Sequence, residues 1–305
     1  MERKDIVLNN GVTMPPIGYG VFRMTNLEEC ESAVVQAVKT GYRLIDTAAA
    51  YENETAVGKA IKRVIAEGIV KREDLFVTTK LWITDTNYEK AKEGFQRSLD
   101  RLGLDYVDIF YHHRMDPETP LEETMGALDS IVKSGKALYV GLSNYDGPTL
   151  ERACAILNDL KCPFIINQNR YSIFDRTIEK NGLKDTARRL QRGIIAFSPL
   201  AQGMLTDRYL NGIPADSRIA TDGRFLKETA LTPERLSQIR ALNELAKKRG
   251  QTLAEMALSW ILKDGDVTSV LIGASRPEQI LDNIAIVGHT SFTPEELDAI
   301  DQITL

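Results

Sequence analysis

The feature that most constrains the fold is the alternation of short apolar runs with longer amphipathic stretches along the 305 residues. The runs are rich in β-branched and aromatic side chains, which is typical of buried strands. An N-terminal stretch with the hairpin signal Asn-Gly precedes them. In chain order the eight runs are IGYG, RLID, LFVTTK, YVDIFYHH, LYVGLS, FIINQ, GIIAFS and SVLIG.

The stretches between the runs have apolar residues at helical spacing, as in EECESAVVQAVKTG, YEKAKEGFQRSLDRLG and LEETMGALDSIVKSG, and the last two end in the glycine of a helix C-terminus. Successive run ends at Gly20, Asp46, Lys80, His113 and Ser143 are separated by 26, 34, 33 and 30 residues. A strand and its crossover helix need about 30 residues. The spacing predicts an α/β fold, a (β/α)8 TIM barrel with an N-terminal β-hairpin and extra helices, as a single domain over residues 1–305.

The rival architecture is a doubly wound open sheet. It would require a glycine fingerprint after the first strand, and GYGVFR lacks the third glycine of that motif. The 74 residues from Ser198 to Ile272 exceed two repeat units, which predicts a long loop from Gly203 to about Pro233 on the catalytic face. A helix in PERLSQIRALNELAKKRG is then expected before the one in TLAEMALSWILKDG.

Composition excludes several classes of function. A net charge of −5 has the wrong sign for a nucleic-acid binder, and a solvated helix face explains the basic cluster of Lys184, Arg188, Arg189 and Arg192. Three cysteines without a CxxC pair and three histidines without HExxH argue against disulfides and a zinc site. Without a secretory or membrane-spanning segment, we expect a cytoplasmic protein that binds neither nucleic acid nor membrane.

The chemistry is expected at the run ends, because sites in barrels of this kind form at the carboxyl ends of the strands. Asp46, Lys80 and His113 close three successive runs, and Tyr51 follows the first of them by five residues. A phenol has a pKa near 10, and a nearby ammonium is expected to lower it, with a carboxylate keeping the ammonium charged. These residues therefore suggest a proton donor, Tyr51, supported by Lys80 and Asp46, with His113 orienting a carbonyl.

Other interpretations of these residues remain open at this point. Asp46 and Lys80 could form an ion pair at the barrel mouth without catalytic function, and His113 could be a satisfied core histidine. Lys80 could also form a Schiff base with a carbonyl substrate, as in aldolases.

Motifs along almost the whole chain resemble those of the aldo-keto reductase superfamily. They are GYRLIDTAAAYENE, TTKLW, LDYVDIFYHH, GLSNY, NQNRY, FSPLAQG and IGASRPEQILDNI. The resemblance implies that Tyr51 is the general acid, that Asp46 and Lys80 support it, and that His113 orients the substrate. It selects His113 rather than His112, since the family's histidine lies five residues after the aspartate that Asp108 matches. His112 is then expected to pack outward.

The same resemblance implies an NADP(H) cofactor held without a Rossmann fold. Ser143, Asn144 and Gln168 would bind the nicotinamide carboxamide, and Phe197 would stack on the ring where many relatives have tyrosine. Ser198, Leu200 and Gln202 would follow the diphosphate, and an arginine beside the 2′-phosphate favours NADP over NAD. The full set of implied cofactor residues is Gly20, Val21, Ser143, Asn144, Gln168, Phe197, Ser198, Leu200, Gln202, Ser275, Arg276, Gln279 and Asn283.

Phe22 and Trp82, at the ends of the first and third runs, are expected to line an aromatic substrate pocket, and Arg114 to meet an anionic group on the substrate. The predicted function is NADPH-dependent reduction of small aldehydes and ketones. The alternatives are a cofactor-binding regulatory subunit and a weakly active barrel scaffold. The first half resembles the 2,5-diketogluconate reductase and prostaglandin F synthase branch, and the rest the glyceraldehyde 3-phosphate reductase and channel β-subunit branch. The seam near residues 111–116 suggests a recombined or engineered chimera, with an unusual natural member as the alternative.

Overall fold

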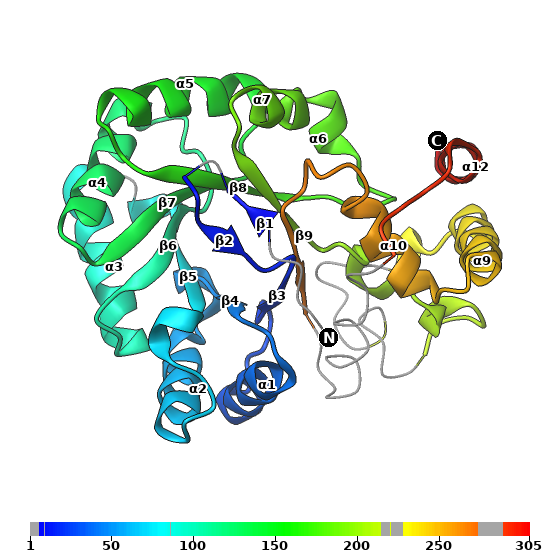
Figure 1. The fold of residues 1–305 in the computed structure, drawn as a ribbon, viewed down its shortest axis with the longest axis horizontal. Coiled ribbons are helices and arrows are strands. Elements are labelled where there is room, and N and C mark those ends of the chain that lie inside the picture. The colour runs from blue at the N-terminus through cyan, green and yellow to red at the C-terminus, as the bar shows by residue number, and fades with distance from the viewer. Residues whose placement is uncertain (1–5, 9, 86, 215–219, 221–227, 274–288) are drawn as a thin grey trace.

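A closed barrel of eight parallel strands forms the centre of the computed structural model, which describes residues 6–8, 10–85, 87–214, 220, 228–273 and 289–305 (Figure 1). The strand order around the barrel is β10-β3-β4-β5-β6-β7-β8-β9. Each of the eight apolar runs forms one strand, so the predicted (β/α)8 fold is confirmed. The strands are β3 (Ile17–Gly20), β4 (Leu44–Asp46), β5 (Phe76–Leu81), β6 (Val107–His112), β7 (Ala137–Ser143), β8 (Phe164–Arg170), β9 (Gly193–Phe197) and β10 (Ser269–Ile272).

Helices surround the barrel and connect its strands (Figure 1). The α-helices are α1 (Leu27–Thr40), α2 (Glu54–Ala66), α3 (Tyr88–Leu102), α4 (Leu121–Lys133), α5 (Gly147–Asp159), α6 (Thr177–Lys180), α7 (Leu183–Arg189), α9 (Pro233–Lys248), α10 (Leu253–Ile261) and α12 (Pro294–Thr304). Short 3₁₀ turns are η1 (Ala49–Tyr51), η2 (Arg72–Asp74), η3 (Ile83–Asp85), η4 (Ala201–Gly203), η5 (Asp207–Tyr209) and η6 (Glu228–Ala230).

Local sequence signals set several helix ends, among them the two glycine ends that were expected. The side chain of Asn87 caps the start of α3, and Gly103 ends it in the left-handed conformation at φ 59°. Helix α4 ends at Lys133, and the glycine expected at its C-terminus, Gly135, follows one residue after the cap at φ 76°. Within the described residues, no helix combines the length and apolar character that a membrane crossing requires.

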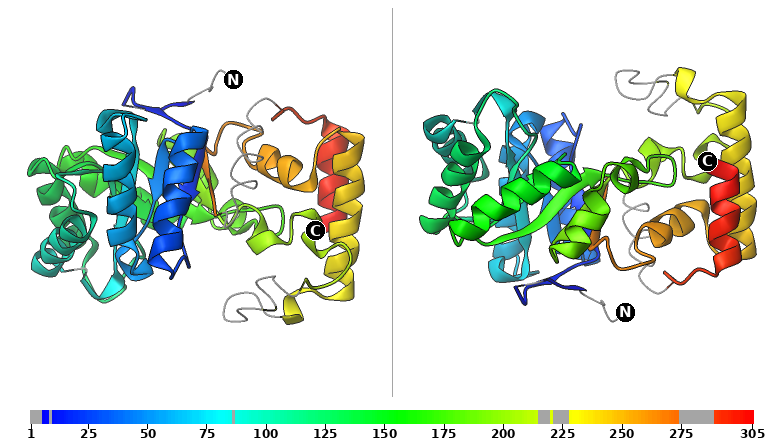
Figure 2. Two further views of the ribbon diagram at one scale, coloured as in Figure 1. Left: turned by 90° about the horizontal axis from the view of Figure 1, so that it is seen from below. Right: turned by 90° about the horizontal axis from the view of Figure 1, so that it is seen from above.

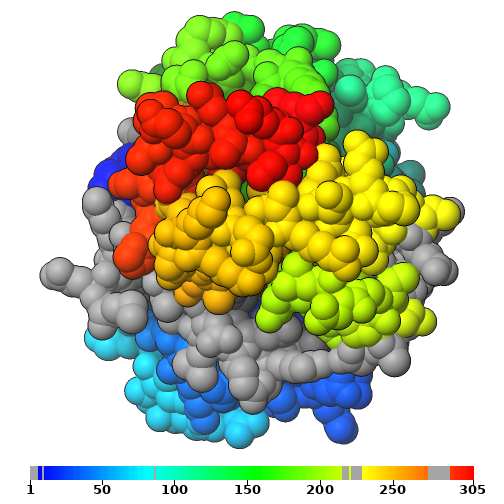
Figure 3. All heavy atoms as spheres, turned by 90° about the vertical axis from the view of Figure 1, so that its right-hand side faces the viewer, coloured from blue at the N-terminus to red at the C-terminus, as the bar shows by residue number. Residues whose placement is uncertain are grey.

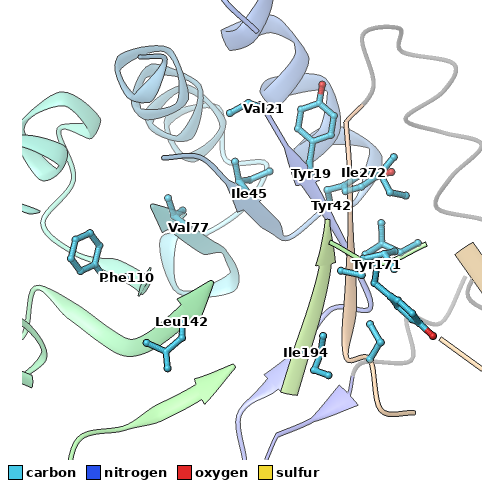
Figure 4. Close-up of a cluster of buried hydrophobic side chains, with 14 of the residues drawn as sticks. Tyr19, Val21, Tyr42, Ile45, Val77, Phe110, Leu142, Tyr171, Ile194 and Ile272 are labelled. Carbon is cyan, nitrogen blue, oxygen red and sulfur yellow. The ribbon is translucent and has the colours of Figure 1, made fainter. Parts of the chain in front are cut away.

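Two apolar layers build the core because strand side chains alternate between the barrel interior and the helices. Ile45, Val77, Phe110 and Leu142 belong to the large cluster between the strands and the helices (Figure 4). The barrel interior holds a second cluster with members on different strands, among them Leu44, Ile109, Ile166 and Leu271. The N-terminal hairpin, β1 (Ile6–Val7) and β2 (Thr13–Met14), adds Leu8 and Met14 to that interior cluster.

The C-terminal helices form a separate layer beside the barrel. Helices α9 and α12 run side by side in both views of Figure 2, and Figure 3 shows them together with α10 on one face of the molecule. Thr293 and Glu296 form a capping box at the start of α12, and the buried Ile300 joins the core. The sequence reasoning proposed α9 and α10 but not α12.

The long loop predicted between β9 and α9 is partly described. Gly203, Thr206, Arg208 and Tyr209 line the cavity at the end of the barrel where the strands have their carboxyl ends, which is the face on which the loop was expected. The segment is not free of secondary structure, since η5 and η6 lie in it.

The prediction of a solvated basic face was wrong for Lys184, whose residue is only 9% exposed. Helix α7 presents Lys184 and Arg188 to Asp264 and Asp266, on the connection that leads into β10. The basic residues therefore join two parts of the barrel wall through ion pairs. A pattern of charges on one helix could not reveal these partners, which lie about eighty residues further along the chain.

Candidate active site

The side chains of Asp46, Lys80 and Tyr51 meet at the carboxyl ends of β4 and β5. The Lys80 ammonium donates hydrogen bonds to Asp46 Oδ2 at 2.6 Å, to the Thr47 carbonyl oxygen at 2.8 Å and to the Tyr51 hydroxyl at 3.4 Å. Lys80 is fully buried, whereas Tyr51 is partly exposed at the end of η1. The Tyr51 phenol therefore lines the cavity at this end of the barrel, whereas the Lys80 ammonium lies behind it.

Two further donors hold the Asp46 carboxylate. Thr78 donates from its hydroxyl to Asp46 Oδ1 at 2.7 Å, and Gln168 donates from Nε2 to the same oxygen at 3.0 Å. Both oxygens of a nearly buried carboxylate are therefore used. The three donors offset the desolvation of this carboxylate and hold it in place beside Lys80.

We expected the pKa of Tyr51 to be lowered, but the net shift in the structure is upwards, so that prediction was wrong. Burial raises the pKa of Tyr51 more than the nearby Lys80 ammonium lowers it, and Asp46 raises it further. Burial lowers the pKa of Lys80, but Asp46 and Tyr51 together outweigh it, so the pKa of Lys80 is raised. At neutral pH the pair is thus a neutral phenol beside an ammonium, which is the state that a proton donor requires.

His113 and His112 lie on opposite sides of the barrel wall. His113 lines the cavity next to the strand ends, with its ring centroid 6.0 Å from that of Tyr51. Burial, followed by the charges of Lys80 and Arg114, lowers its pKa to about 3, so the imidazole is neutral near pH 7. His112 points outward, is 1% exposed, and its Nδ1 lies 2.7 Å from the Tyr145 hydroxyl. His112 packs against Tyr145 on the outer side, as the motif comparison led us to expect.

Aromatic residues border the phenol. The Phe22 ring centroid lies 4.9 Å from that of Tyr51, and the Trp82 centroid lies 5.4 Å from that of His113. Phe22 is 47% and Trp82 41% exposed, so both offer apolar surface to a ligand. Arg114 is exposed on the same rim and close enough to influence the pKa of His113.

A second polar group follows at the ends of β7 and β8. Ser143 donates to the Gln168 carbonyl oxygen at 2.8 Å, and Asn144 donates to the His113 carbonyl oxygen at 2.9 Å. Asn144 adopts a left-handed conformation at φ 60°, which asparagine tolerates better than most residues. Phe197, at the end of β9, presents a partly exposed ring beside this group.

The chain after Phe197 turns sharply. Ser198, Ala201 and Gln202 have φ values of 52°, 48° and 59°, in the left-handed region that non-glycine residues seldom adopt. With this conformation Ser198, Leu200 and Gln202 all line the cavity within five positions of the end of β9.

One cavity of about 2440 Å³ gathers these groups. It exceeds the roughly 300–1,000 Å³ of ordinary small-molecule pockets, which suits an extended ligand together with a small one. The predicted site residues that line it are Gly20, Phe22, Asp46, Tyr51, Trp82, His113, Arg114, Ser143, Asn144, Gln168, Phe197, Ser198, Leu200 and Gln202.

Two predicted site residues do not line the cavity, and four are not described. Lys80 is fully buried behind the cavity wall, with its ammonium 3.4 Å from the Tyr51 hydroxyl. Val21 is fully buried in the apolar core, so its side chain has no surface for a cofactor (Figure 4). The remaining four, Ser275, Arg276, Gln279 and Asn283, lie outside the described residues.

The sequence reasoning missed Thr78, which binds Asp46 from inside the barrel. Residues two apart on a strand share a face, so Thr78 lies on the same face of β5 as Lys80. That alternation was available in the sequence and could have identified it.

The closed barrel and the polar cluster at its carboxyl end place the chain among (β/α)8-barrel proteins with a site at the strand ends. The chain belongs to the aldo/keto reductase family, whose model matches residues 16–305. This confirms the resemblance seen in the motifs.

Relatives cover nearly the whole chain. L-glyceraldehyde 3-phosphate reductase of Escherichia coli (strain K12) is 41% identical over 96% of this chain and 90% of its own length. Glyoxal reductase of Bacillus subtilis (strain 168) is 33% identical over 98% of this chain and 93% of its own length. A putative voltage-gated potassium channel subunit beta of Schizosaccharomyces pombe is 34% identical over 91% and 85%.

Solved structures share the fold. A thermostable aldo-keto reductase in complex with the inhibitor epalrestat superposes with a TM-score of 0.79, 28% identity, and coverage of 99% of this chain and 100% of that chain. The Bombyx mori aldo-keto reductase in complex with NADP superposes with a TM-score of 0.77 at 28% identity, and the match covers 99% of this chain and 93% of that chain. The E. coli match extends over both halves of the chain, and the comparisons do not show a chimeric or designed origin.

Proposed function

We propose that this protein reduces small aldehydes and ketones to alcohols with NADPH, and that Tyr51 supplies the proton. The observation that carries the proposal is the Tyr51 hydroxyl at the cavity wall, 3.4 Å from a buried ammonium that Asp46 holds at 2.6 Å. Two relatives named as reductases of glyceraldehyde 3-phosphate and of glyoxal support the same chemistry.

The protein's own residues would act on the carbonyl oxygen. His113, which is neutral, can donate a hydrogen bond to that oxygen and orient it towards Tyr51. As the carbonyl carbon accepts a hydride, the oxygen gains negative charge and takes the proton of the Tyr51 hydroxyl. The Lys80 ammonium then stabilises the phenolate that remains, and Asp46 keeps the ammonium in place. The products are an alcohol and a phenolate that takes up a proton again from solvent.

The cavity fits a nicotinamide cofactor, which when bound would supply the hydride. Ser143, Asn144 and Gln168 provide hydroxyl and amide groups for a carboxamide, and the Phe197 ring beside them can stack on a planar heterocycle. Ser198, Leu200 and Gln202 continue the lining away from the strand end. The complex of the Bombyx mori relative with NADP supports this choice of cofactor.

The substrate is expected to be small and to lie between Phe22 and Trp82, which offer flat apolar surfaces on the rim next to Tyr51. Arg114 could pair with a phosphate or carboxylate on the substrate. We propose that residues 1–305 work as one such domain, located in the cytoplasm.

A Schiff base at Lys80 is disfavoured by its surroundings. Its nitrogen is buried and donates to three acceptors, so no lone pair faces the cavity. The relative named as a channel subunit supports a second candidate function, that of a cofactor-binding regulatory protein. Reduction of a carbonyl would not be needed for that function.

The test combines binding and turnover. Trp82 lines the cavity while Trp260 is 1% exposed, so NADPH should quench mainly the emission of Trp82, and Trp82→Phe is the control. NADPH consumption is then followed with methylglyoxal, 4-nitrobenzaldehyde and glyceraldehyde 3-phosphate. Quenching with turnover supports the reductase, quenching without turnover on any carbonyl supports the regulatory subunit, and no quenching contradicts both.

A further inference from the structure

The segment that carries Tyr51 is attached to β5 on both faces of the strand. Inside the barrel, Lys80 Nζ lies 3.4 Å from the Tyr51 hydroxyl. Outside it, the hydroxyl of the preceding residue, Thr79, donates to Glu54 Oε1 at 2.5 Å. Tyr51 and Glu54 are three residues apart, and Thr79 and Lys80 are neighbours. The two contacts therefore tie one short segment to both faces of β5.

Glu54 is held in this place at an energetic cost. It is the first residue of α2 and is only 1% exposed. A buried carboxylate needs compensation, which Arg101 of α3 gives by donating from Nε to Glu54 Oε2 at 2.6 Å. Each carboxylate oxygen of Glu54 thus has its own partner. The partner of Oε1 is Thr79, which lies on β5 next to Lys80.

The other side of the segment is fixed by Asn53. Its Nδ2 donates to the Val21 carbonyl oxygen at 2.9 Å, and its Oδ1 accepts from the Thr47 hydroxyl at 2.7 Å. The Thr47 carbonyl oxygen in turn accepts from Lys80. The bond between Glu54 and Thr79 is thus the connection to the outer face of β5, beside the bonds that Lys80 makes on the inner face.

We propose that Glu54 is a positioning residue for the proton donor: through Thr79 it sets the separation between the Tyr51 hydroxyl and the Lys80 ammonium. The inference rests on the proposed function, in which Tyr51 gives up its proton beside that ammonium. A reacting group displaced by about 1 Å can lose on the order of a hundredfold in rate, so a partial loosening is expected to be measurable.

The decisive variant is Thr79→Val, which removes the hydroxyl and keeps the shape of the side chain. Thr79→Ser restores the donor, and Thr79→Ala replaces the valine variant if the latter does not fold. Ser98→Ala is the matched control, because Ser98 is buried like Thr79 and also loses one hydrogen bond, from Arg101 Nη2 at 3.2 Å, while the Thr79 bond to Glu54 stays in place. All variants are compared as purified full chains with NADPH.

For Thr79→Val we expect kcat to fall about tenfold, with KM for the carbonyl and Kd for NADPH within about twofold of the parent. In the alcohol-oxidising direction, which needs the phenolate, the acidic limb of the pH profile should move to higher pH as the lowering influence of Lys80 weakens. Thr79→Ser should recover both values, and Ser98→Ala should change neither.

The inference is overturned if Thr79→Val, or Thr79→Ala in its place, matches Ser98→Ala in kcat and in the pH profile and differs from the parent only in thermal stability. Tyr51→Phe separates this failure from that of the proposed function. If Tyr51→Phe retains the parent rate, the proton donor itself is misassigned, and if it is inactive while Thr79→Val is normal, only the role of Glu54 is wrong.

Discussion

The ion pair of Asp46 and Lys80 allows stability and catalysis to be separated by a double-mutant cycle. Asp46→Asn and Lys80→Met each leave a buried charge without its partner, because Lys80 is fully buried and Asp46 is 3% exposed. Removing one member of such a pair typically costs about 3–5 kcal/mol. Each single variant should therefore unfold at clearly lower urea concentration than the parent.

The double variant removes both charges, and its loss of stability should be less than the sum of the single losses by about 2 kcal/mol or more. Turnover should behave differently. Lys80→Met and the double variant lack the ammonium beside Tyr51, and Asp46→Asn leaves that ammonium without the carboxylate that holds it. All three variants should therefore lose about a hundredfold or more in kcat, and the double variant should gain nothing back.

Urea unfolding at pH 7.5 gives the stabilities, and NADPH consumption at saturating carbonyl gives kcat. Additive stability losses would show that the two side chains are not coupled as the 2.6 Å contact requires. Recovery of turnover in the double variant would show that the charge of Lys80 is not needed for proton donation.

Three further predictions concern stability and specificity. Burial lowers the pKa of His112 from 6.5 to about 4, so the unfolded chain binds more protons between these values, and stability, full above pH 6.5, should fall towards pH 4. Between pH 7.5 and pH 5 the free energy of unfolding, measured with urea, should fall by about 2 kcal/mol less in His112→Gln than in the parent. An equal fall in both proteins would refute this. Gly58→Ala would place a Cβ 1.9 Å from the Leu102 carbonyl oxygen, and should destabilise by about 3 kcal/mol in the same assay; a neutral effect would contradict the packing of α2 on α3. Arg114→Leu should raise KM about tenfold for glyceraldehyde 3-phosphate and leave methylglyoxal within about twofold, whereas equal changes would remove Arg114 from substrate recognition.

The barrel could be predicted because its signals are local and repeat along the chain. Eight apolar runs at intervals of about 30 residues specify strands and crossovers, and parallel strands bring their carboxyl ends together. Asp46, Lys80 and His113 could thus be assigned to one mouth before the structure was known. The alternation along β6 could not decide between His112 and His113 without the inner and outer faces of that strand.

What the sequence could not give depends on distances between separate segments. The direction of the Tyr51 pKa follows from a balance between burial and the charge of Lys80, and only the structure weighs them. Likewise Glu54 reads as an ordinary charged residue at a helix start until Thr79 and Arg101 are seen against it. Pairings of this kind involve residues 25 and 47 positions apart, for which the local pattern carries no signal.

The measurement that tests the central claim most directly is the rate of NADPH consumption by Tyr51→Phe at saturating methylglyoxal, with Kd for NADPH measured by Trp82 fluorescence. Phenylalanine keeps the ring and removes the proton, so we predict a loss of kcat of about a hundredfold or more with Kd within about twofold. A variant that binds NADPH and reduces methylglyoxal at the parent rate would contradict the assignment of Tyr51 as the proton donor.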